Sequence, residues 1–239
     1  MINATFINKR HIKLSDRVRQ VMGSSRNGQI YELGMVQAFF NKMVAIPRDK
    51  YVYLDIGANT GSYALLPIIK DNITCHAFEP NPVAYDVLKE NVELNNLKNT
   101  HIHNMGFWKE DKELELKTPK DLSDSGLSTL GENPTRFKYS NKTGEYTTQK
   151  VECKKIDTIV EELKLEEVHA IKIDTEGAEL FILQGGEKTL KSQKPLLLLE
   201  YDDKNTKQFG YLREDIKNLL ILYGYDNFVM YGKSDIFVF

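Results

Sequence analysis

Cysteine is scarce in this sequence: only Cys75 and Cys153 occur among 239 residues. The chain contains no CxxC motif and no His/Cys pair at the spacing of a zinc site. These absences argue against a disulfide framework or a structural zinc site. We therefore expect two reduced thiols in a cytoplasmic protein.

Long apolar runs and a basic excess are also missing. No stretch of about 18 consecutive apolar residues occurs, so we expect no membrane-spanning helix. The first 14 residues are polar and lack the apolar centre of a secretion signal. The formal net charge is −2, from 32 Lys and Arg against 34 Asp and Glu. This balance provides no basic surplus for a phosphate backbone, so a nucleic-acid partner is not expected.

What the sequence does contain, from residue 51 onward, is an alternation of short apolar runs with helical patterns. This alternation predicts βαβ units and a mostly parallel sheet. The final two strands are too close in sequence for a helical crossover, so they should form an antiparallel hairpin. Five parallel strands followed by such a hairpin indicate a Rossmann-like class I methyltransferase fold with seven strands. The expected strands are 51–56, 73–78, 100–105, 169–173, 195–201, 227–231 and 235–239, and the expected helices are 62–69, 82–95, 157–163, 178–190 and 212–223.

Two segments fall outside this alternation. Apolar residues from Ile30 to Met43 recur at helical spacing, so residues 1–50 are predicted to form a helical cap whose apolar face covers the pocket mouth. The methyltransferase domain would then span residues 51–239. Within it, strands near 113–117 and 147–153 flank a polar stretch, which predicts an antiparallel insertion with a substrate-facing loop at about 118–146.

A glycine-containing turn follows the first predicted strand of the sheet. It reads Asp55-Ile-Gly57-Ala-Asn59-Thr-Gly61. Glycines permit a tight turn and close approach of a ligand, and unpaired N–H groups at a following helix start would attract an anionic group. A dehydrogenase would need GxGxxG, but asparagine occupies position 59. The structural alternative is an ordinary helix-start turn capped by Asn59.

Glu79 strengthens the ligand-binding interpretation of that turn. It ends the second strand, about 20 residues beyond the glycines, where an acidic side chain can accept two ribose hydroxyl hydrogen bonds. Alone, Glu79 could be a solvated strand end. Together, the two features predict an adenosine site.

Three carboxylates follow the fourth and fifth parallel strands. Asp174 and Glu176 come after one strand and Glu200 ends the next, so they should meet at the carboxyl edge of the sheet. Lys172 lies two residues before Asp174, on the same strand face, and can balance part of their charge. Glu179 is more simply explained as a favourable residue at a helix start.

Together these motifs resemble those of the FkbM-type methyltransferases, in order and spacing, over roughly residues 52–201. The resemblance implies O-methylation by S-adenosylmethionine, commonly of a sugar in a glycan or natural product. The matching stretches are 54–61, 77–82, 90–96, 171–179, 183–187 and 195–200.

The resemblance also implies where the cofactor binds. The methionine end would be held by the glycine turn, the ribose by Glu79, and the adenine by the segment after the third strand, with Asp174 nearby. The implied residues are Asp55, Gly57, Ala58, Asn59, Gly61, Glu79, Pro80, Asn104, Gly106, Phe107 and Asp174.

A sugar hydroxyl needs help to lose its proton at neutral pH. Asp174, Glu176 and Glu200 could provide a general base, or they could hold Mg²⁺, which prefers oxygen ligands. The sequence favours the metal-free version slightly, because no ligand geometry is evident. His103, near the end of the third strand, is the next candidate base.

Three other functions share parts of this pattern. A nicotinamide dehydrogenase should have the GxGxxG turn that is absent here. A nucleic-acid amino-methyltransferase should have an NPPY or DPPY signature and a basic face. A binding protein that has lost activity would not be expected to keep Asp55, Glu79 and Asp174.

Overall fold

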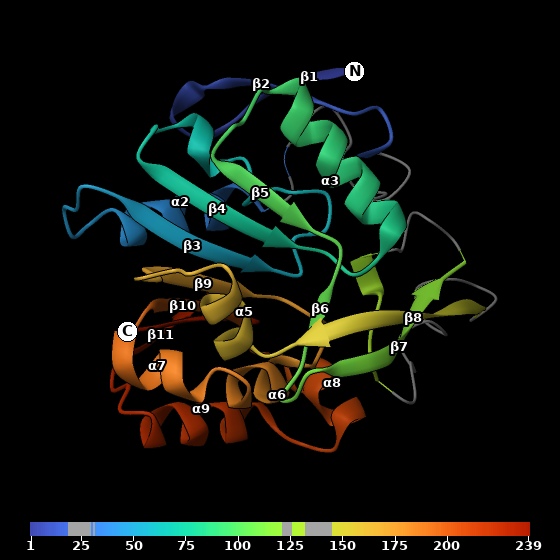
Figure 1. Ribbon diagram of the computed structural model, residues 1–239, viewed down its shortest axis with the longest axis vertical. Helices are drawn as coiled ribbons and strands as arrows, with labels where there is room; N and C mark the ends of the chain where they lie inside the picture. Colours follow the sequence, from blue (N-terminus) through green and yellow to red (C-terminus); the bar gives the residue numbers. More distant parts are fainter. Residues whose placement is uncertain (19–29, 31, 121–125, 132–144) are drawn as a thin grey trace.

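A seven-stranded sheet forms the centre of the computed structural model, which describes residues 1–18, 30, 32–120, 126–131 and 145–239 (Figure 1). The strand order is β11-β12-β10-β9-β3-β4-β5. Five strands run parallel, while β12 is antiparallel to both β10 and β11. This confirms the predicted parallel sheet and terminal hairpin. The strands are β3 (Tyr51–Ile56), β4 (Ile73–Phe78), β5 (Thr100–His103), β9 (Ala170–Ile173), β10 (Leu196–Glu200), β11 (Phe228–Tyr231) and β12 (Asp235–Val238).

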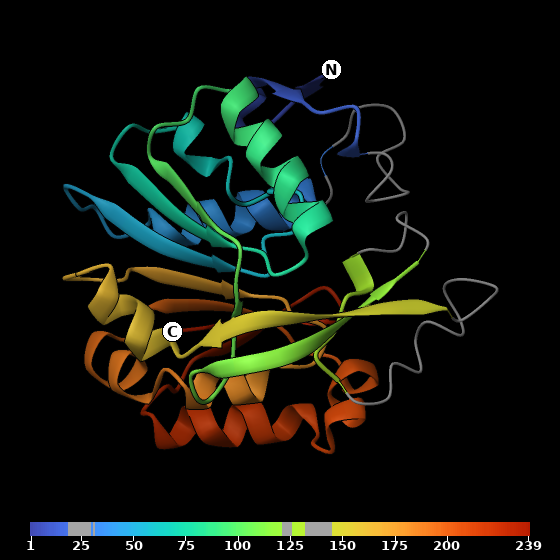
Figure 2. The same ribbon diagram turned by 45° about the vertical axis from the view of Figure 1, so that its right-hand side comes forward.

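Helices cover both faces of this sheet, and side chains on each strand alternate between two apolar cores. On β3, Tyr53 belongs to the core beneath α2 and α3, whereas Leu54 belongs to the core beneath α5, α6, α7 and α9. Figure 2 shows the two helical layers on opposite sides of the sheet. The helices are α2 (Leu33–Met43), α3 (Pro82–Leu94), α5 (Ile156–Glu162), α6 (Glu179–Gln184), α7 (Glu187–Gln193) and α9 (Arg213–Leu222).

Local sequence explains where α3 begins. The Asn81 side chain caps the helix by accepting a hydrogen bond from the Val83 N–H at 3.0 Å, and Pro82 occupies the first helical position, where no N–H donor is needed. The predicted helix over residues 62–69 is wrong. That stretch forms turns followed by the short 3₁₀ helix η2 (Leu66–Ile68), because Pro67 cannot donate the hydrogen bond an α-helix interior requires.

The first fifty residues are not the wholly helical cap that was predicted. Residues at the start pair as an antiparallel hairpin of β1 (Ile2–Thr5) and β2 (His11–Leu14), with the 3₁₀ turn η1 (Ile7–Lys9) between them. The apolar stripe of α2 packs on the sheet. Residues 19–29 and 31 of the predicted cap lie outside the described residues, and Glu32 lines the cavity. Phe39 is fully buried, and its ring meets the rings of Tyr53 and Tyr63 edge-on at 5.8 and 5.7 Å. Burial against two aromatic rings stabilises this position more than partial cover of a polar opening would.

The insertion before α5 builds a second, three-stranded sheet in the order β6-β8-β7. Its long strands β7 (Lys112–Pro119) and β8 (Tyr146–Lys154) are antiparallel, as predicted, and β6 (Gly106–Phe107) adds parallel to β8. The predicted loop at 118–146 lies partly outside the described residues. Residues 118–119 belong to β7 and Tyr146 to β8, and the described residues 126–131 return to β7 through backbone pairing of Thr129 with Lys117.

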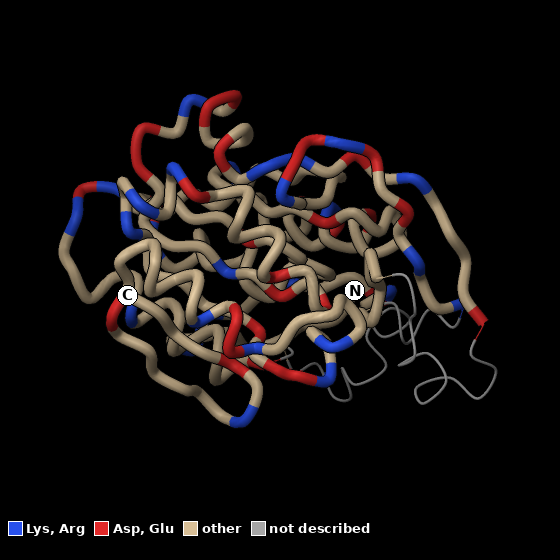
Figure 3. The backbone as a smooth tube through the Cα atoms, turned by 90° about the horizontal axis from the view of Figure 1, so that it is seen from below, with Lys and Arg blue, Asp and Glu red and all other residues tan. Residues whose placement is uncertain are grey.

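Two further features concern membrane-spanning helices and the distribution of charged residues. Within the described part of the chain, no helix is long and apolar enough to cross a membrane. Figure 3 shows Lys and Arg interspersed with Asp and Glu along the described backbone.

Candidate active site

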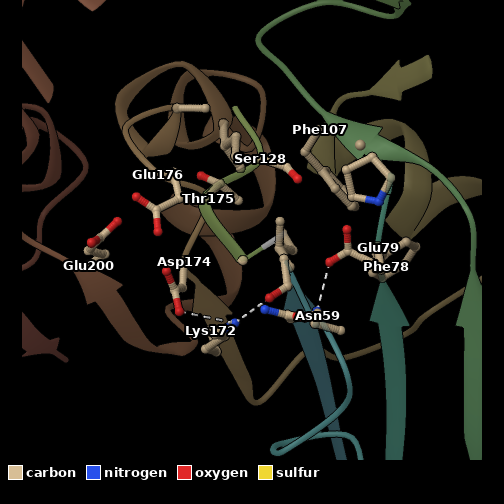
Figure 4. Close-up of a pocket in the computed structure, with 18 of the residues that line it drawn as sticks. Asn59, Phe78, Glu79, Phe107, Ser128, Lys172, Asp174, Thr175, Glu176 and Glu200 are labelled. Atoms are coloured by element: carbon tan, nitrogen blue, oxygen red, sulfur yellow. Dashed lines mark hydrogen bonds and ion pairs between the residues drawn. The ribbon is translucent and has the colours of Figure 1, made fainter. Parts of the chain in front are cut away.

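A cavity of about 580 Å³ opens at the carboxyl ends of β3, β4, β9 and β10, the edge where open α/β sheets bind ligands. Further parts of its wall come from Glu32 just before α2, from residues 105–107 after β5, from residues 126–128 and Leu130 of the insertion, and from residues 234–235 of the terminal hairpin. In Figure 4, Asn59, Phe78, Glu79 and Phe107 lie on one side of the cavity, and Asp174, Glu176 and Glu200 lie on the other. The site therefore has an aromatic side and an acidic side.

The glycine turn after β3 adopts the left-handed conformation that its composition predicts. Gly57, Asn59 and Gly61 have φ angles of 75°, 50° and 98°. A Cβ at position 57 would lie 2.0 Å from the Asp174 carbonyl oxygen, so only glycine fits between the two loops. At position 61 a Cβ would lie 2.6 Å from Leu88, which makes that glycine a packing requirement of α3.

One expectation about this turn is wrong. No α-helix follows it directly, so the turn does not present the N-terminus of a helix to a ligand. The chain instead continues through turns, in which the Gly61 N–H bonds the Ala58 carbonyl. Ala58 and Asn59 still line the cavity.

Glu79 is held rigidly beneath the aromatic side. Its two carboxylate oxygens accept hydrogen bonds from the backbone N–H groups of Asn59 at 2.7 Å and Asn81 at 2.8 Å. Only 6% of Glu79 is exposed, and burial raises its pKa to about 7 despite these two bonds. Each oxygen keeps a second lone pair, so the side chain can still accept hydroxyl donors from a ligand.

Apolar side chains surround the space beyond Glu79, where a flat ring could lie. The rings of Phe78 and Phe107 meet edge-on at 4.8 Å. A Cβ at Gly106 would lie 2.8 Å from the Cys153 sulfur, so the strand packs closely here. Other apolar residues that line the cavity include Pro80, Met105, Leu116, Leu127 and Leu130.

Lys172 joins the two sides of the cavity beneath its floor. Its Nζ donates to the Gly57 carbonyl at 2.6 Å and forms ion pairs with Asp55 at 3.3 Å and Asp174 at 3.7 Å. Burial raises the pKa of Asp55, which Lys172 opposes. Burial lowers the pKa of Lys172, but the negative charges of Asp55 and Asp174 raise it by more. The pKa of Lys172 is therefore raised overall. This confirms that Lys172 balances charge beside Asp174.

On the acidic side, Asp174, Glu176 and Glu200 come together as predicted. Burial raises the pKa of Glu200 well above its usual range, and Glu176 and Asp174 raise it further by repulsion. Asp235 of the terminal hairpin is a fourth carboxylate in this wall. Its pKa is raised to about 6 by burial and by Asp174.

Four predicted site residues do not line the cavity. Asp55 and Gly61 support the turn from below, as described above. The Asn104 side chain donates to the Glu79 carbonyl at 2.8 Å and so fixes the strand end. His103 stacks on Phe78 with ring centroids 4.5 Å apart, behind the cavity wall. Among the residues that the structure describes, no three carboxylate, histidine or cysteine side chains form a group that could hold a metal ion, so the geometry does not support a Mg²⁺ site.

Two residues of the site, Asn205 and Asp235, were not predicted from the sequence. Asn205 lies in the short helix α8 (Asp203–Thr206) and is 1% exposed. Its side-chain amide donates to Glu176 at 3.1 Å and also to Glu200. Its position five residues after Glu200 was the only available signal. Asp235 sits beside Glu200 because β12 pairs with β10 in the register Glu200–Asp235.

The fold and this divided pocket define a class I methyltransferase architecture. The methyltransferase FkbM domain profile matches residues 55–226, which is most of the chain. This protein therefore belongs to the FkbM methyltransferase domain family.

Individual relatives agree with that assignment. The chain is 27% identical over 151 residues to Methyltransferase 1 of Beauveria bassiana, covering 58% of this chain and 59% of that protein. It is 30% identical over 162 residues to Methyltransferase sdnD of Sordaria araneosa, covering 59% and 61%. The matches thus span about three fifths of these relatives' length.

Two solved structures share the fold. The FkbM methyltransferase of Methylobacillus flagellatus superposes with a TM-score of 0.55 at 15% identity, over 82% of this chain and 46% of that one. A putative caffeoyl-CoA O-methyltransferase from Staphylococcus aureus gives a TM-score of 0.52 at 13% identity, over 88% and 84%.

Proposed function

We propose that this methyltransferase uses S-adenosylmethionine to methylate a hydroxyl group of a sugar, in a glycan or a glycosylated natural product. The observation that carries the proposal is the divided cavity. A buried carboxylate under an aromatic wall suits adenosine, and the carboxylates opposite suit a hydroxylated acceptor. The free, buried thiols of Cys75 and Cys153 agree with the cytoplasmic location that we also propose.

The cofactor assignments follow from these positions. Glu79 would accept hydrogen bonds from the two ribose hydroxyls, because it lines the cavity and backbone N–H groups hold both of its oxygens in place. Phe107, Pro80 and Gly106 would flank the adenine ring. Gly57, Ala58 and Asn59 would approach the methionine end, with Asp174 near its ammonium group.

When bound, S-adenosylmethionine supplies an electrophilic methyl group, which moves to the acceptor oxygen while the sulfur keeps the electron pair of the broken bond. The chain must align the acceptor and exclude water from the site. A carboxylate on the acidic side would take the acceptor's hydroxyl proton. Glu200 suits this role less well, because burial raises its pKa and favours its protonated form.

Calorimetry with S-adenosylhomocysteine tests the cofactor part of the proposal. We expect binding to the wild type, with a higher Tm in its presence. Glu79→Ala should weaken binding by roughly 1–3 kcal/mol, the range for lost charge-assisted hydrogen bonds. Glu93→Ala, which removes an exposed glutamate on α3, is the matched control and should bind as the wild type does.

A screen of monosaccharides and oligosaccharides, read by mass spectrometry, tests the acceptor part. Transfer of a methyl group to a sugar oxygen would support the proposal. No binding of S-adenosylhomocysteine, together with tight binding of NAD, would refute it. Transfer only to nucleic acid or to a non-sugar molecule would refute the acceptor class and keep the cofactor.

A further inference from the structure

Residues 205–211, which follow β10, hold the loop that carries Glu176 through side-chain hydrogen bonds. Gln208 donates from its side chain to the Glu176 carbonyl at 2.7 Å, and the Tyr211 hydroxyl donates to the Gly177 carbonyl at 2.7 Å. A third donor is Asn205, whose amide reaches the Glu176 carboxylate itself. Three side chains from residues 205–211 thus fix one short loop.

The two segments also touch at the level of the backbone. A Cβ at Gly177 would lie 2.5 Å from the Asn205 carbonyl oxygen, and Gly177 has a φ of 108°. Glu176 itself has a φ of 58°, a conformation that costs free energy for a residue with a side chain. The surrounding contacts hold Glu176 in this conformation and aim its side chain along the cavity wall.

Asn205 connects this loop to the end of the neighbouring strand. Its single amide nitrogen donates to Oε2 of Glu176 and to Oε1 of Glu200. The backbone around Asn205 is fixed because its N–H donates to the carbonyl of Asp202, the residue that caps the start of α8. The other oxygen of Glu200, Oε2, is buried and has no hydrogen-bond partner among the residues that the structure describes.

The chemistry of an amide matters at this position. An amide has two N–H donors and no charge, so it can bind two carboxylates without cancelling their repulsion. A lysine or arginine would stabilise both carboxylates in the ionised form and make them weak bases. With an amide, the two carboxyls stay close without a compensating charge, so we expect their titrations to be coupled. Burial raises the pKa of Glu200, and repulsion from Glu176, Asp174 and Glu179 raises it further, while the hydrogen bond from Asn205 lowers it.

We propose that Asn205 is a positioning residue that holds Glu176 and Glu200 together as one proton-sharing pair, with Glu176 accepting the hydroxyl proton of the acceptor. This rests on the proposed methyl transfer. In that step the acceptor O–H bond breaks, its proton passes to the Glu176 carboxylate, and the oxygen bonds the methyl group as the cofactor's carbon–sulfur bond breaks.

Carbon-13 NMR of glutamate side-chain carboxyls measures this pair without any cofactor or acceptor. Glu176→Gln and Glu200→Gln assign the two signals. In the wild type we expect Glu200 to titrate above an ordinary glutamate. Glu176→Gln should lower the pKa of Glu200 by about one pH unit or more, as expected for coupled carboxyls.

Asn205→Asp tests the positioning role with almost no change in shape. It replaces the shared donor by a third carboxylate, so the titration of the pair should shift upward by about one pH unit or more. The acid limb of the pH–rate profile, measured on a sugar found in the screen, should shift in the same direction. Binding of S-adenosylhomocysteine should remain within about twofold. Asn41→Asp is the matched control, because Asn41 is exposed on α2 and uses its side-chain oxygen to accept a bond from Gln37.

An Asn205→Asp variant whose carboxyl titration and rate profile match those of the wild type would overturn the proposal. If that variant does not fold, an unchanged pKa of Glu200 in Glu176→Gln overturns it instead. Failure of the wild type to bind S-adenosylhomocysteine would refute the proposed function alone, since the carboxyl titrations decide separately whether Asn205 joins the pair.

Discussion

The pKa of Glu79 predicts how cofactor affinity depends on pH. In the free protein burial raises this pKa to about 7, so the side chain is largely protonated in mildly acidic solution. Ribose hydroxyls that donate to Glu79 favour its ionised form. Cofactor binding should therefore lower the pKa of Glu79, and affinity should rise with pH until about pH 7 and then level off.

The size of this effect follows from the shift. At pH 5, two units below the free-state pKa, only about 1% of Glu79 is ionised. If the bound state keeps Glu79 ionised at that pH, the apparent Kd should be about 100-fold higher than its plateau value above pH 8. This corresponds to about 2.7 kcal/mol, at 1.36 kcal/mol for each pH unit.

Calorimetric titration of S-adenosylhomocysteine between pH 5 and pH 8 measures this dependence directly. The buffer-dependent heat should also show proton release on binding near pH 6. Glu79→Gln cannot ionise, so its affinity should be lower at pH 8 and nearly independent of pH. A constant wild-type Kd across this range, or the same slope in Glu79→Gln, would refute the assignment of Glu79 to the ribose.

Three other predictions concern the scaffold and can be checked by urea unfolding. Burial and neighbouring histidines lower the pKa of His76 to about 4, so the free energy of unfolding should fall as pH drops from about 6.5 towards 4. His76→Phe should remove roughly 1–3 kcal/mol of that loss. An equal loss in the variant and the wild type would contradict this. Gly57→Ala should destabilise the protein far more than Gly210→Ala. Gly210 has a similar φ of 80°, but a Cβ there would have nothing within 4 Å, so its substitution should cost only about 1 kcal/mol. Equal effects would show that the close approach of position 57 to the Asp174 carbonyl is unimportant. Lys172→Met should cost about 3–5 kcal/mol by leaving Asp55 buried and charged, and adding Asp55→Asn should recover part of this loss; no recovery would argue against the ion pair.

Much of the fold was predictable because its signals are local. Strands buried on both faces are short apolar runs, and Asn81 before α3 and Pro82 at its first position mark where that helix starts. The strand ends then locate the glycine turn, Glu79 and the three carboxylates at one edge of the sheet. The helix expected over 62–69 failed where a local rule was overlooked, since Pro67 lies inside it.

The periodicity of α2 shows why other features were not predictable. A helical apolar stripe predicts that one face of the helix will be buried, but it does not predict which element will pack against that face. In this protein the sheet buries the apolar face of α2, in part through Tyr53. A helix that covered the pocket would have needed the same helical spacing of apolar residues. Only the tertiary packing distinguishes these two arrangements.

The sequence by itself determined the alternation of strands and helices, the family and the edge of the sheet where the site lies, because each depends on neighbouring residues or fixed spacings. Only the tertiary structure decided the charge balance of that site. Asp55 meets Lys172 through the register of β3 against β9, and Asp235 meets Glu200 through that of β10 against β12. Asn205 reaches two carboxylates because α8 folds back on the loop after β9. These contacts join separate strands and loops, and since no fixed sequence spacing relates such segments, their partners emerge only when the chain is packed.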